Sequence, residues 1–139
     1  MTDTCEITYA QQLVYKGLVC AYCKQPTDFI DSAVIYNGRS FGMVYACLPC
    51  RAWVGVHHGN TRDAYGRVAN KELRLAKNDA HRAFDRIWRE KHMGRGKAYK
   101  WLGKQLGIPK DYCHIGYFGV DTCKRVVEVC NKFLNNENT

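Results

Sequence analysis

The chain has 139 residues and a formal net charge of +8, and 46% of its residues are hydrophobic. This length suits one compact domain or a small module joined to another, and the apolar content excludes wholesale disorder. The first ten residues lack the features of a signal peptide, and no apolar run is long enough to span a bilayer. We therefore expect a cytoplasmic protein with no membrane partner.

The N-terminal part predicts a β-hairpin. Residues 7–19 fit a strand or a short helix, but residues 28–36 and 39–46 both have the pattern of strands. Between them, Asn37-Gly38 accepts the positive φ values of a type I′ turn. Alternation in the second strand puts Phe41, Met43 and Tyr45 on one face, which we expect to be buried.

Further along, RAWVGV at residues 51–56 fits a third strand. After Asn70 the apolar period changes to that of a helix, which we expect to end near Lys91. Gly94 and Gly96 separate it from a second predicted helix. The apolar residues of the first helix are Leu73, Ala76, Ala80, Phe84, Ile87 and Trp88.

The second helix contains Ala98, Trp101, Leu102 and Leu106, and Gly107 is expected to close it. CHIGYFGV, at residues 113–120, fits a loop or a short extended piece. Asp121 is the expected N-cap of a last helix. The inward positions predicted for that helix are Val126, Val127, Cys130, Phe133 and Leu134.

Four of the eight cysteines form two C-x-x-C pairs, Cys20 with Cys23 and Cys47 with Cys50. Each pair can form a tight knuckle that aims two thiolates at one ion, and the predicted hairpin brings the knuckles together. Four thiolates complete a tetrahedron around Zn²⁺, which leaves no position for water, so the ion would be structural. The alternatives are a redox pair and iron bound at the same four sulfurs.

The other cysteines lack this paired spacing. Cys5, Cys113, Cys123 and Cys130 stand alone in the sequence. Cys123 and Cys130 are seven residues apart on a helical face, which is typical of core thiols. We expect no second metal site from them.

The chain resembles a bacterial and phage family of zinc-finger-containing domains whose activity is not characterised. The two C-x-x-C pairs carry the resemblance together with AWVGVHHGNT, GRVANKELR, AHRAFDRIW, AYKWLGKQLGI and CHIGYFGVDTC, over about residues 20–130. It implies a zinc ribbon followed by a helical part. The recurring histidine of the family falls on His57, and Ala64-Tyr65-Gly66 stands where relatives often have Pro-Leu-Gly.

Charge is distributed unevenly along the chain. Residues 1–50 contain three Lys or Arg and four Asp or Glu, whereas residues 51–110 contain fifteen and five. A basic segment beside a neutral one favours a nucleic-acid partner, although such charges can also form a solvated surface. The candidate contacts lie around the predicted start of the first long helix and along it: Arg62, Arg67, Lys71, Arg74, Lys77 and Arg82.

Adjacent histidines follow the second knuckle. Four thiolates would fill the zinc tetrahedron, so neither His57 nor His58 has a coordination position left. We expect His57, on the strand face of Trp53, to make an orienting hydrogen bond where the ribbon meets the helices. His58 is expected to be exposed at the turn that Gly59 implies.

Two other functional classes fit the same residues. An HNH-like nuclease would use His57 or His58 as its base, with Asn70 and His81 completing a metal unit, but both cysteine pairs precede this segment and no acidic cluster offers Mg²⁺ a site. A phage-type adaptor or inhibitor would bind an acidic patch on a host protein. Whether the chain is an enzyme stays open, and we assign no catalytic residue.

The sequence thus predicts an α+β fold with an N-terminal zinc ribbon packed on about three helices. We expect a ribbon module at residues 1–60 and a basic helical region at residues 61–139, forming one compact unit. The predicted function is nucleic-acid binding through the basic helical surface, with structural zinc and little sequence specificity.

Overall fold

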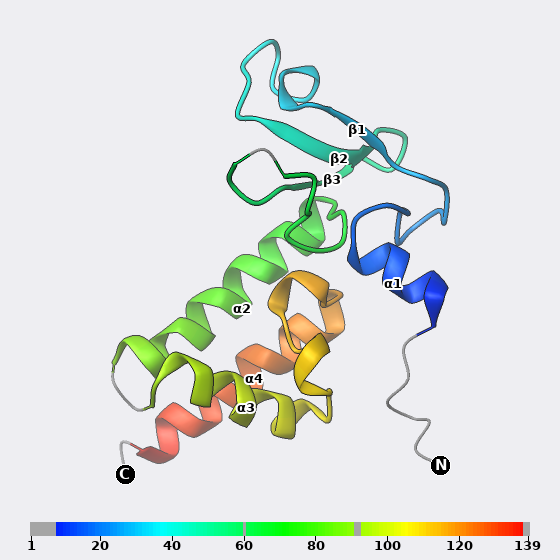
Figure 1. Cartoon of the computed structure of the whole chain (residues 1–139). Helices are drawn as coiled ribbons and strands as arrows, with labels where there is room; N and C mark the ends of the chain where they lie inside the picture. The colour runs from blue at the N-terminus through cyan, green and yellow to red at the C-terminus, as the bar shows by residue number, and fades with distance from the viewer. Residues whose placement is uncertain (1–7, 60, 91–92, 138–139) are drawn as a thin grey trace. The chain divides into compact units, whose positions relative to one another are not determined.

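A computed structural model describes residues 8–59, 61–90 and 93–137 of the chain. They form two compact units, one ending at Lys71 and the other beginning at Glu72. We call them the ribbon unit (residues 8–71) and the helical unit (residues 72–137). The fold class is α+β, as predicted, because a three-stranded antiparallel sheet is combined with α-helices (Figure 1).

The ribbon unit begins with helix α1, Tyr9–Tyr15. Thr8 and Gln11 form a capping box: the Gln11 N–H donates to Thr8 Oγ1 at 3.1 Å, and the Thr8 N–H donates to Gln11 Oε1 at 3.0 Å. These bonds satisfy two backbone N–H groups that a helix start leaves without partners. Of the two structures that the sequence allowed here, the helix is therefore the one formed.

The sheet contains β1 (Asp28–Asp31), β2 (Met43–Cys47) and β3 (Ala52–Gly55), in the order β1-β2-β3. Both neighbours pair antiparallel with β2, with Tyr45 opposite Phe29 on one side and opposite Val54 on the other. The predicted hairpin and third strand are confirmed. Antiparallel pairing returns the chain so that the two cysteine pairs come together.

The predicted tight turn of the hairpin is wrong. Asn37 and Gly38 do have positive φ values of 54° and 89°. However, the last pair of the hairpin is Asp31 with Met43, so residues 32–42 connect the strands and include a 3-10 helix, η2, Ser32–Val34. The Asp31 carboxylate accepts from the Ala33 N–H at 2.8 Å, which turns the chain away from the strand early.

The alternation predicted for the second strand is also wrong. Phe41 lies outside β2 with 69% of its surface exposed, and Met43 is 37% exposed. By contrast, every residue from Val44 to Cys47 is buried. As the central strand, β2 is covered on both faces, so its side chains do not divide into a buried and an exposed set.

The helical unit is built on three helices, α2 (Lys71–Arg89), α3 (Arg95–Leu106) and α4 (Val120–Glu137). Gly107 ends α3 with a φ of 70°, as its position predicted. Asp121 is in the first turn of α4 rather than at its N-cap, because the helix already begins at Val120.

Two 3-10 helices connect α3 and α4: η3, Lys110–Tyr112, and η4, Ile115–Tyr117. Only η4 lies within residues 113–120, where the sequence predicted a loop or a short extended piece.

An aromatic pair and an arginine join the three helices. The rings of Phe84 and Tyr99 are 4.5 Å apart between centroids. The Arg125 guanidinium donates to the carbonyls of Leu106 and Gln105 at 3.4 and 3.3 Å, so a side chain of α4 satisfies the end of α3. The core around them includes Leu73, Ala80, Ala83, Ile87, Ala98, Leu102, Cys113, Ile115, Phe118, Cys123, Val126, Cys130 and Leu134.

None of the helices in the described residues has the length and apolar character needed to cross a membrane.

Candidate metal centre

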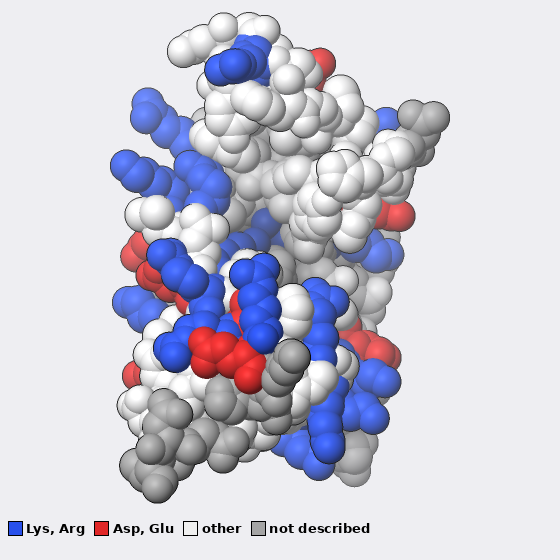
Figure 2. Space-filling view, turned by 90° about the vertical axis from the view of Figure 1, so that its left-hand side faces the viewer, with Lys and Arg blue, Asp and Glu red and all other residues white. Residues whose placement is uncertain are grey.

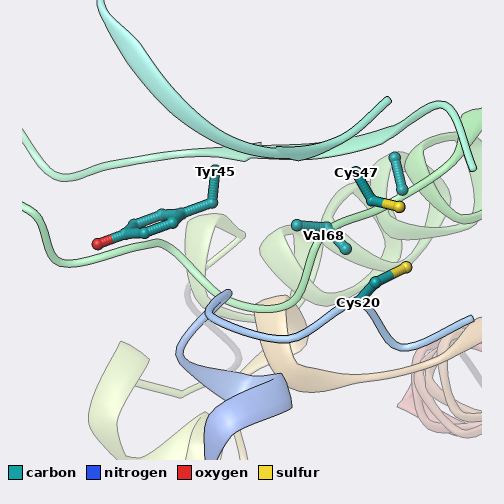
Figure 3. Close-up of a cluster of buried hydrophobic side chains, with 5 residues drawn as sticks. Cys20, Tyr45, Cys47 and Val68 are labelled. Carbon is teal, nitrogen blue, oxygen red and sulfur yellow. The ribbon is translucent and has the colours of Figure 1, made fainter. Parts of the chain in front are cut away.

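The core of the ribbon unit is small and contains two of the paired cysteines. Cys20, Tyr45, Cys47, Ala52 and Val68 form its buried cluster. Figure 3 shows Val68 between the Tyr45 ring and the two cysteines, whose sulfurs point to the same side. Packing therefore fixes one thiol of each pair in place and directs both away from the apolar cluster.

Each C-x-x-C pair forms a tight turn. In the first, the Lys24 N–H donates to the Cys20 carbonyl at 3.0 Å, and the Tyr22 N–H donates to Cys20 Sγ at 3.4 Å. In the second, the Arg51 N–H donates to the Leu48 carbonyl at 3.0 Å. Lys24 and Arg51, which directly follow the pairs, have positive φ values of 65° and 53°. The two knuckles therefore share a left-handed residue directly after the second cysteine.

The four ligand atoms of Cys20, Cys23, Cys47 and Cys50 all lie within 4.8 Å of one another. The Sγ atoms of Cys23 and Cys47 are 3.7 Å apart. A disulfide requires about 2.0 Å. Two sulfurs in a zinc tetrahedron lie about 3.8 Å apart when each is about 2.3 Å from the ion. The spacing therefore fits thiolates around one metal ion rather than a disulfide.

The charges of the four thiolates favour a bound cation. The hydrogen bond with Cys47, followed by burial, raises the pKa of Cys50 to about 12. The Gln25 backbone N–H lowers the pKa of the exposed Cys23. Four thiolates at such short separations repel one another strongly, and a bound divalent cation offsets that repulsion.

The donor set suits a closed structural site. Four sulfurs in a tetrahedral arrangement favour zinc, with iron as the alternative. Within residues 8–59, 61–90 and 93–137, this is the only group of three or more His, Cys, Asp or Glu side chains placed to hold a metal ion. The arrangement supports a structural metal that ties the two knuckles together.

The two histidines lie apart from the cysteine group, and both are exposed. The His57 backbone N–H donates to the Asp63 carbonyl at 2.9 Å. The centroid of the His57 ring lies 4.3 Å from that of the Tyr65 ring. The expected side-chain hydrogen bond of His57 is not found among the described residues; the ring contact takes its place. The exposure predicted for His58 is confirmed.

The predicted nucleic-acid contacts fall in both units. In the ribbon unit, the Arg62 guanidinium carbon is 4.0 Å from the Phe29 ring centroid, and that of Arg67 is 5.6 Å from the Tyr15 centroid. Lys71 is exposed at the first residue of α2.

The remaining three candidates lie on α2 in the helical unit. Lys77 Nζ donates to the Gly116 carbonyl at 2.9 Å, and Arg82 pairs with Asp79 at 3.0 Å. Arg74 is half-buried. Lys77 and Arg82 thus have partners within their own unit.

A second basic face was missed in the sequence. Lys97, Lys100 and Lys104 are exposed on α3 at positions i, i+3 and i+7, which places them on one side of the helix. α3 contains no Asp or Glu, and none of these lysines has an ion pair among the described residues. On the face drawn in Figure 2, Lys and Arg gather with acidic side chains set among them. Helical spacing in the sequence could have identified the α3 face.

Three of the four remaining cysteines are buried. Cys113, Cys123 and Cys130 are buried in the helical unit, and burial raises the pKa of Cys130 to about 12. Cys123 and Cys130 are therefore the core thiols that their spacing predicted. Cys5 lies outside the described residues.

Comparisons with curated proteins and with solved structures find no match. A family model described as a zinc-finger-containing domain matches residues 16–133. The matched range includes both cysteine pairs, the sheet, and most of the helical unit. The chain belongs to this family of zinc-finger-containing domains.

Proposed function

We propose that the protein holds one structural Zn²⁺ and binds nucleic acid through a basic helical surface. Cys20, Cys23, Cys47 and Cys50 are the proposed ligands, supported by their mutual distances and by the family. The ion would stabilise the ribbon rather than take part in a reaction, because four protein thiolates leave no open position for a substrate.

The observation that carries the nucleic-acid part is the lysine face of α3. Three exposed ammonium groups lie on one side of a helix that has no acidic residue. A row of this kind attracts a polyanion, because each lysine that contacts a phosphate releases a counterion. The opposite side of α3 is buried through Ala98, Leu102 and Leu106, which fixes the orientation of the lysines.

The basic residues of α2 contribute less to this surface. Arg82, Arg86 and Arg89 pair with Asp79, Glu90 and Asp85 respectively, all on α2 itself. An arginine already paired with a carboxylate gains less from a phosphate. Among the candidates on α2, Lys71 and Arg74 lie closest to the start of the helix, where the dipole favours anions.

Little sequence specificity is expected. Flexible lysine side chains contact phosphates, which are the same at every nucleotide, and phosphate contacts position a protein without reading bases. Affinity should therefore depend on salt far more than on sequence.

The test is salt-dependent binding to duplex DNA, single-stranded DNA and RNA. Changing Lys97, Lys100 and Lys104 together to Gln should weaken binding to every sequence and reduce the slope of log affinity against log salt by about 2–3. The matched control changes Lys16, Lys124 and Lys132 to Gln, which removes the same charge from exposed positions elsewhere. Equal losses in both variants would contradict a defined surface.

Two other outcomes redirect the assignment. If the wild-type protein binds no nucleic acid even at low salt, the adaptor for a host protein becomes the better function. If it cleaves plasmid DNA with added Mg²⁺, and the cleavage is lost in His57→Ala with folding intact, the HNH-like nuclease replaces both.

A further inference from the structure

The ribbon unit has an aromatic groove of about 670 Å³ that the basic helical surface does not include. Its lining comes from all three strands and from the loops that follow β1 and β3. The side chains that give it its character are Phe29, Tyr36, Phe41, Trp53, His57, Arg62 and Tyr65. We call this set the aromatic groove.

The rings in the groove are partly open to solvent. Phe41 is 69% exposed, and Tyr36 is 42% exposed. Tyr36 meets Phe41 edge-on with centroids 5.3 Å apart, and it meets Trp53 at 6.4 Å with the planes 78° apart. In each contact one ring presents its edge to the face of the other, so the exposed parts of the rings stay available for a flat ligand.

A second aromatic pair also lines the groove. Tyr65 is 46% exposed and contacts the His57 ring at 4.3 Å. An added Cβ at Gly55 would come within 3.8 Å of the Tyr65 ring, so the tyrosine lies directly over the β3 backbone. Exposed aromatic surface gathered into one depression is uncommon on a protein surface and marks a binding site.

Arg62 is held in place at the edge of the groove. The buried Tyr45 hydroxyl donates to the Arg62 carbonyl at 2.7 Å, which anchors this part of the loop to the core. The Arg62 guanidinium then lies over Phe29, at 4.0 Å from the ring centroid. A guanidinium fixed in this way has its polar edge available to an anion, and little entropy is lost when one binds.

The charge of the groove is positive. Arg39 lies 5.8 Å from the Phe41 ring centroid, so a second guanidinium stands at the groove. No Asp or Glu occurs among its described lining residues. Flat apolar surface beside arginine fits a ligand that combines flat rings with negative charge.

We propose that the aromatic groove binds the unpaired bases of a single-stranded nucleic acid, a proposal that rests on the proposed function and specifies its ligand. The bases stack on Phe41, Tyr36 and Tyr65, and Arg62 and Arg39 contact the phosphates. A duplex does not fit, because its bases already stack on one another and present no free face. The lysine face of α3 adds affinity for phosphates, whereas the groove distinguishes single strands from duplexes.

The experiment compares four labelled probes of about twelve nucleotides, a length within the range that single-strand-binding folds cover. They are oligo-dT, oligo-rU, an abasic strand with the same phosphates, and a duplex. Oligo-dT or oligo-rU should bind at least about tenfold more tightly than the abasic strand at equal salt. Equal affinity for the abasic strand and the base-carrying strands would overturn the proposal.

Variants assign the effect to the groove. Phe41→Ala should lower affinity for the better single strand by about fivefold to a hundredfold and leave the abasic strand unaffected. Phe41→Trp should restore binding, because it restores a flat ring. Tyr9→Ala is the matched control, since Tyr9 is 75% exposed in the same unit and lies on α1, away from the lining residues. Unchanged zinc content and circular dichroism establish that each variant is folded.

The outcomes separate this proposal from the proposed function. If Phe41→Ala binds single strands as the wild type does, while the α3 lysine variant binds all probes weakly, the groove assignment fails and nucleic-acid binding stands. If the wild type binds none of the probes at low salt, both fail. A defect that is equal in Phe41→Ala and Tyr9→Ala would also overturn the role of the groove.

Discussion

The two units of this protein are stabilised in different ways. The helical unit buries large apolar side chains such as Phe84, Leu102 and Ile115. The buried cluster of the ribbon unit contains two cysteines, one alanine, Tyr45 and Val68. So small an apolar cluster supplies little free energy of folding, and the four thiols beside it supply a site for a metal. This difference predicts that the ribbon unit depends on a bound metal ion, whereas the helical unit depends on its hydrophobic core.

Removing the metal should have the largest effect and tests whether the ribbon unit depends on it. Changing Cys47 to Ser or adding a chelator should unfold the ribbon unit and leave the helical unit folded, because structural zinc sites contribute about 10–16 kcal/mol of binding free energy. Two-dimensional NMR should lose the dispersed amide signals of residues 18–70 and keep those of α2, α3 and α4. Elemental analysis should give no zinc in Cys47→Ser. A full zinc content in that variant would show that the ligands are misassigned.

The converse change acts on the helical unit. Phe84 is fully buried on α2, so Phe84→Ala should lower the free energy of unfolding of that unit by about 3–5 kcal/mol through lost packing and the cavity left behind. Zinc content should not change. Denaturant unfolding followed by helical circular dichroism measures the loss, and Leu75→Ala, at an exposed position on the same helix, is the control. Loss of zinc in Phe84→Ala would mean that the two units do not fold independently.

The rate of thiol labelling should distinguish the cysteines of the two units without any mutation. Burial raises the pKa of Cys130 to about 12, so at pH 8 its thiolate population is about a thousandfold below that of an exposed cysteine. Chelation should unfold the ribbon unit, which removes the contacts that raise the pKa of Cys50. Iodoacetamide should then label the four ribbon cysteines quickly and leave Cys113, Cys123 and Cys130 unlabelled. Raising the pH toward 12 favours the thiolate of Cys130 and should speed its labelling. Mass spectrometry of peptides identifies each site, and rapid labelling of Cys130 at pH 8 would contradict its buried state.

The smallest expected effect is within the ribbon unit. Replacing His57 with Ala removes a ring contact with Tyr65 and should lower the free energy of unfolding by about 0.5–1 kcal/mol, with zinc retained. His58→Ala, at an exposed neighbour, should change stability less. Chemical denaturation of both variants in excess zinc measures the difference. A loss above about 2 kcal/mol in His57→Ala would point to a buried hydrogen bond of the kind the sequence predicted.

Local patterns predicted most of the elements and the metal site. The spacing of the four cysteines was sufficient for the metal site, because each knuckle is a local structure and the hairpin between them has a signal of its own. Helical periodicity predicted α2 and α3, and Gly107 marked the end of α3. In each case, residues close together in the sequence determine the structure.

Features that depend on contacts between distant residues were not predicted. Ser32 is buried, and its hydroxyl accepts from the Phe41 N–H at 2.7 Å, so the loop between β1 and β2 is long despite its Asn-Gly pair. The aromatic groove collects rings from Phe29 to Tyr65, and only the sheet brings them together. Three arginines of α2 form ion pairs, whereas the lysines of α3 form none within the described part of the chain, and a count of charges cannot reveal this difference.

The sheet has a further consequence for the behaviour of the protein at high concentration. β3 does not present an open edge, because Trp53 bridges to Ala69 and Val56 bridges to Ala64. At the opposite edge, β1 is only four residues long, with Asp28 and Asp31 at its ends. A strand from another molecule would meet backbone groups that are already hydrogen-bonded at the β3 edge. At the β1 edge it would meet two carboxylates. The sheet is therefore protected against edge-to-edge aggregation, and concentrated, zinc-loaded protein should stay free of β-rich assemblies.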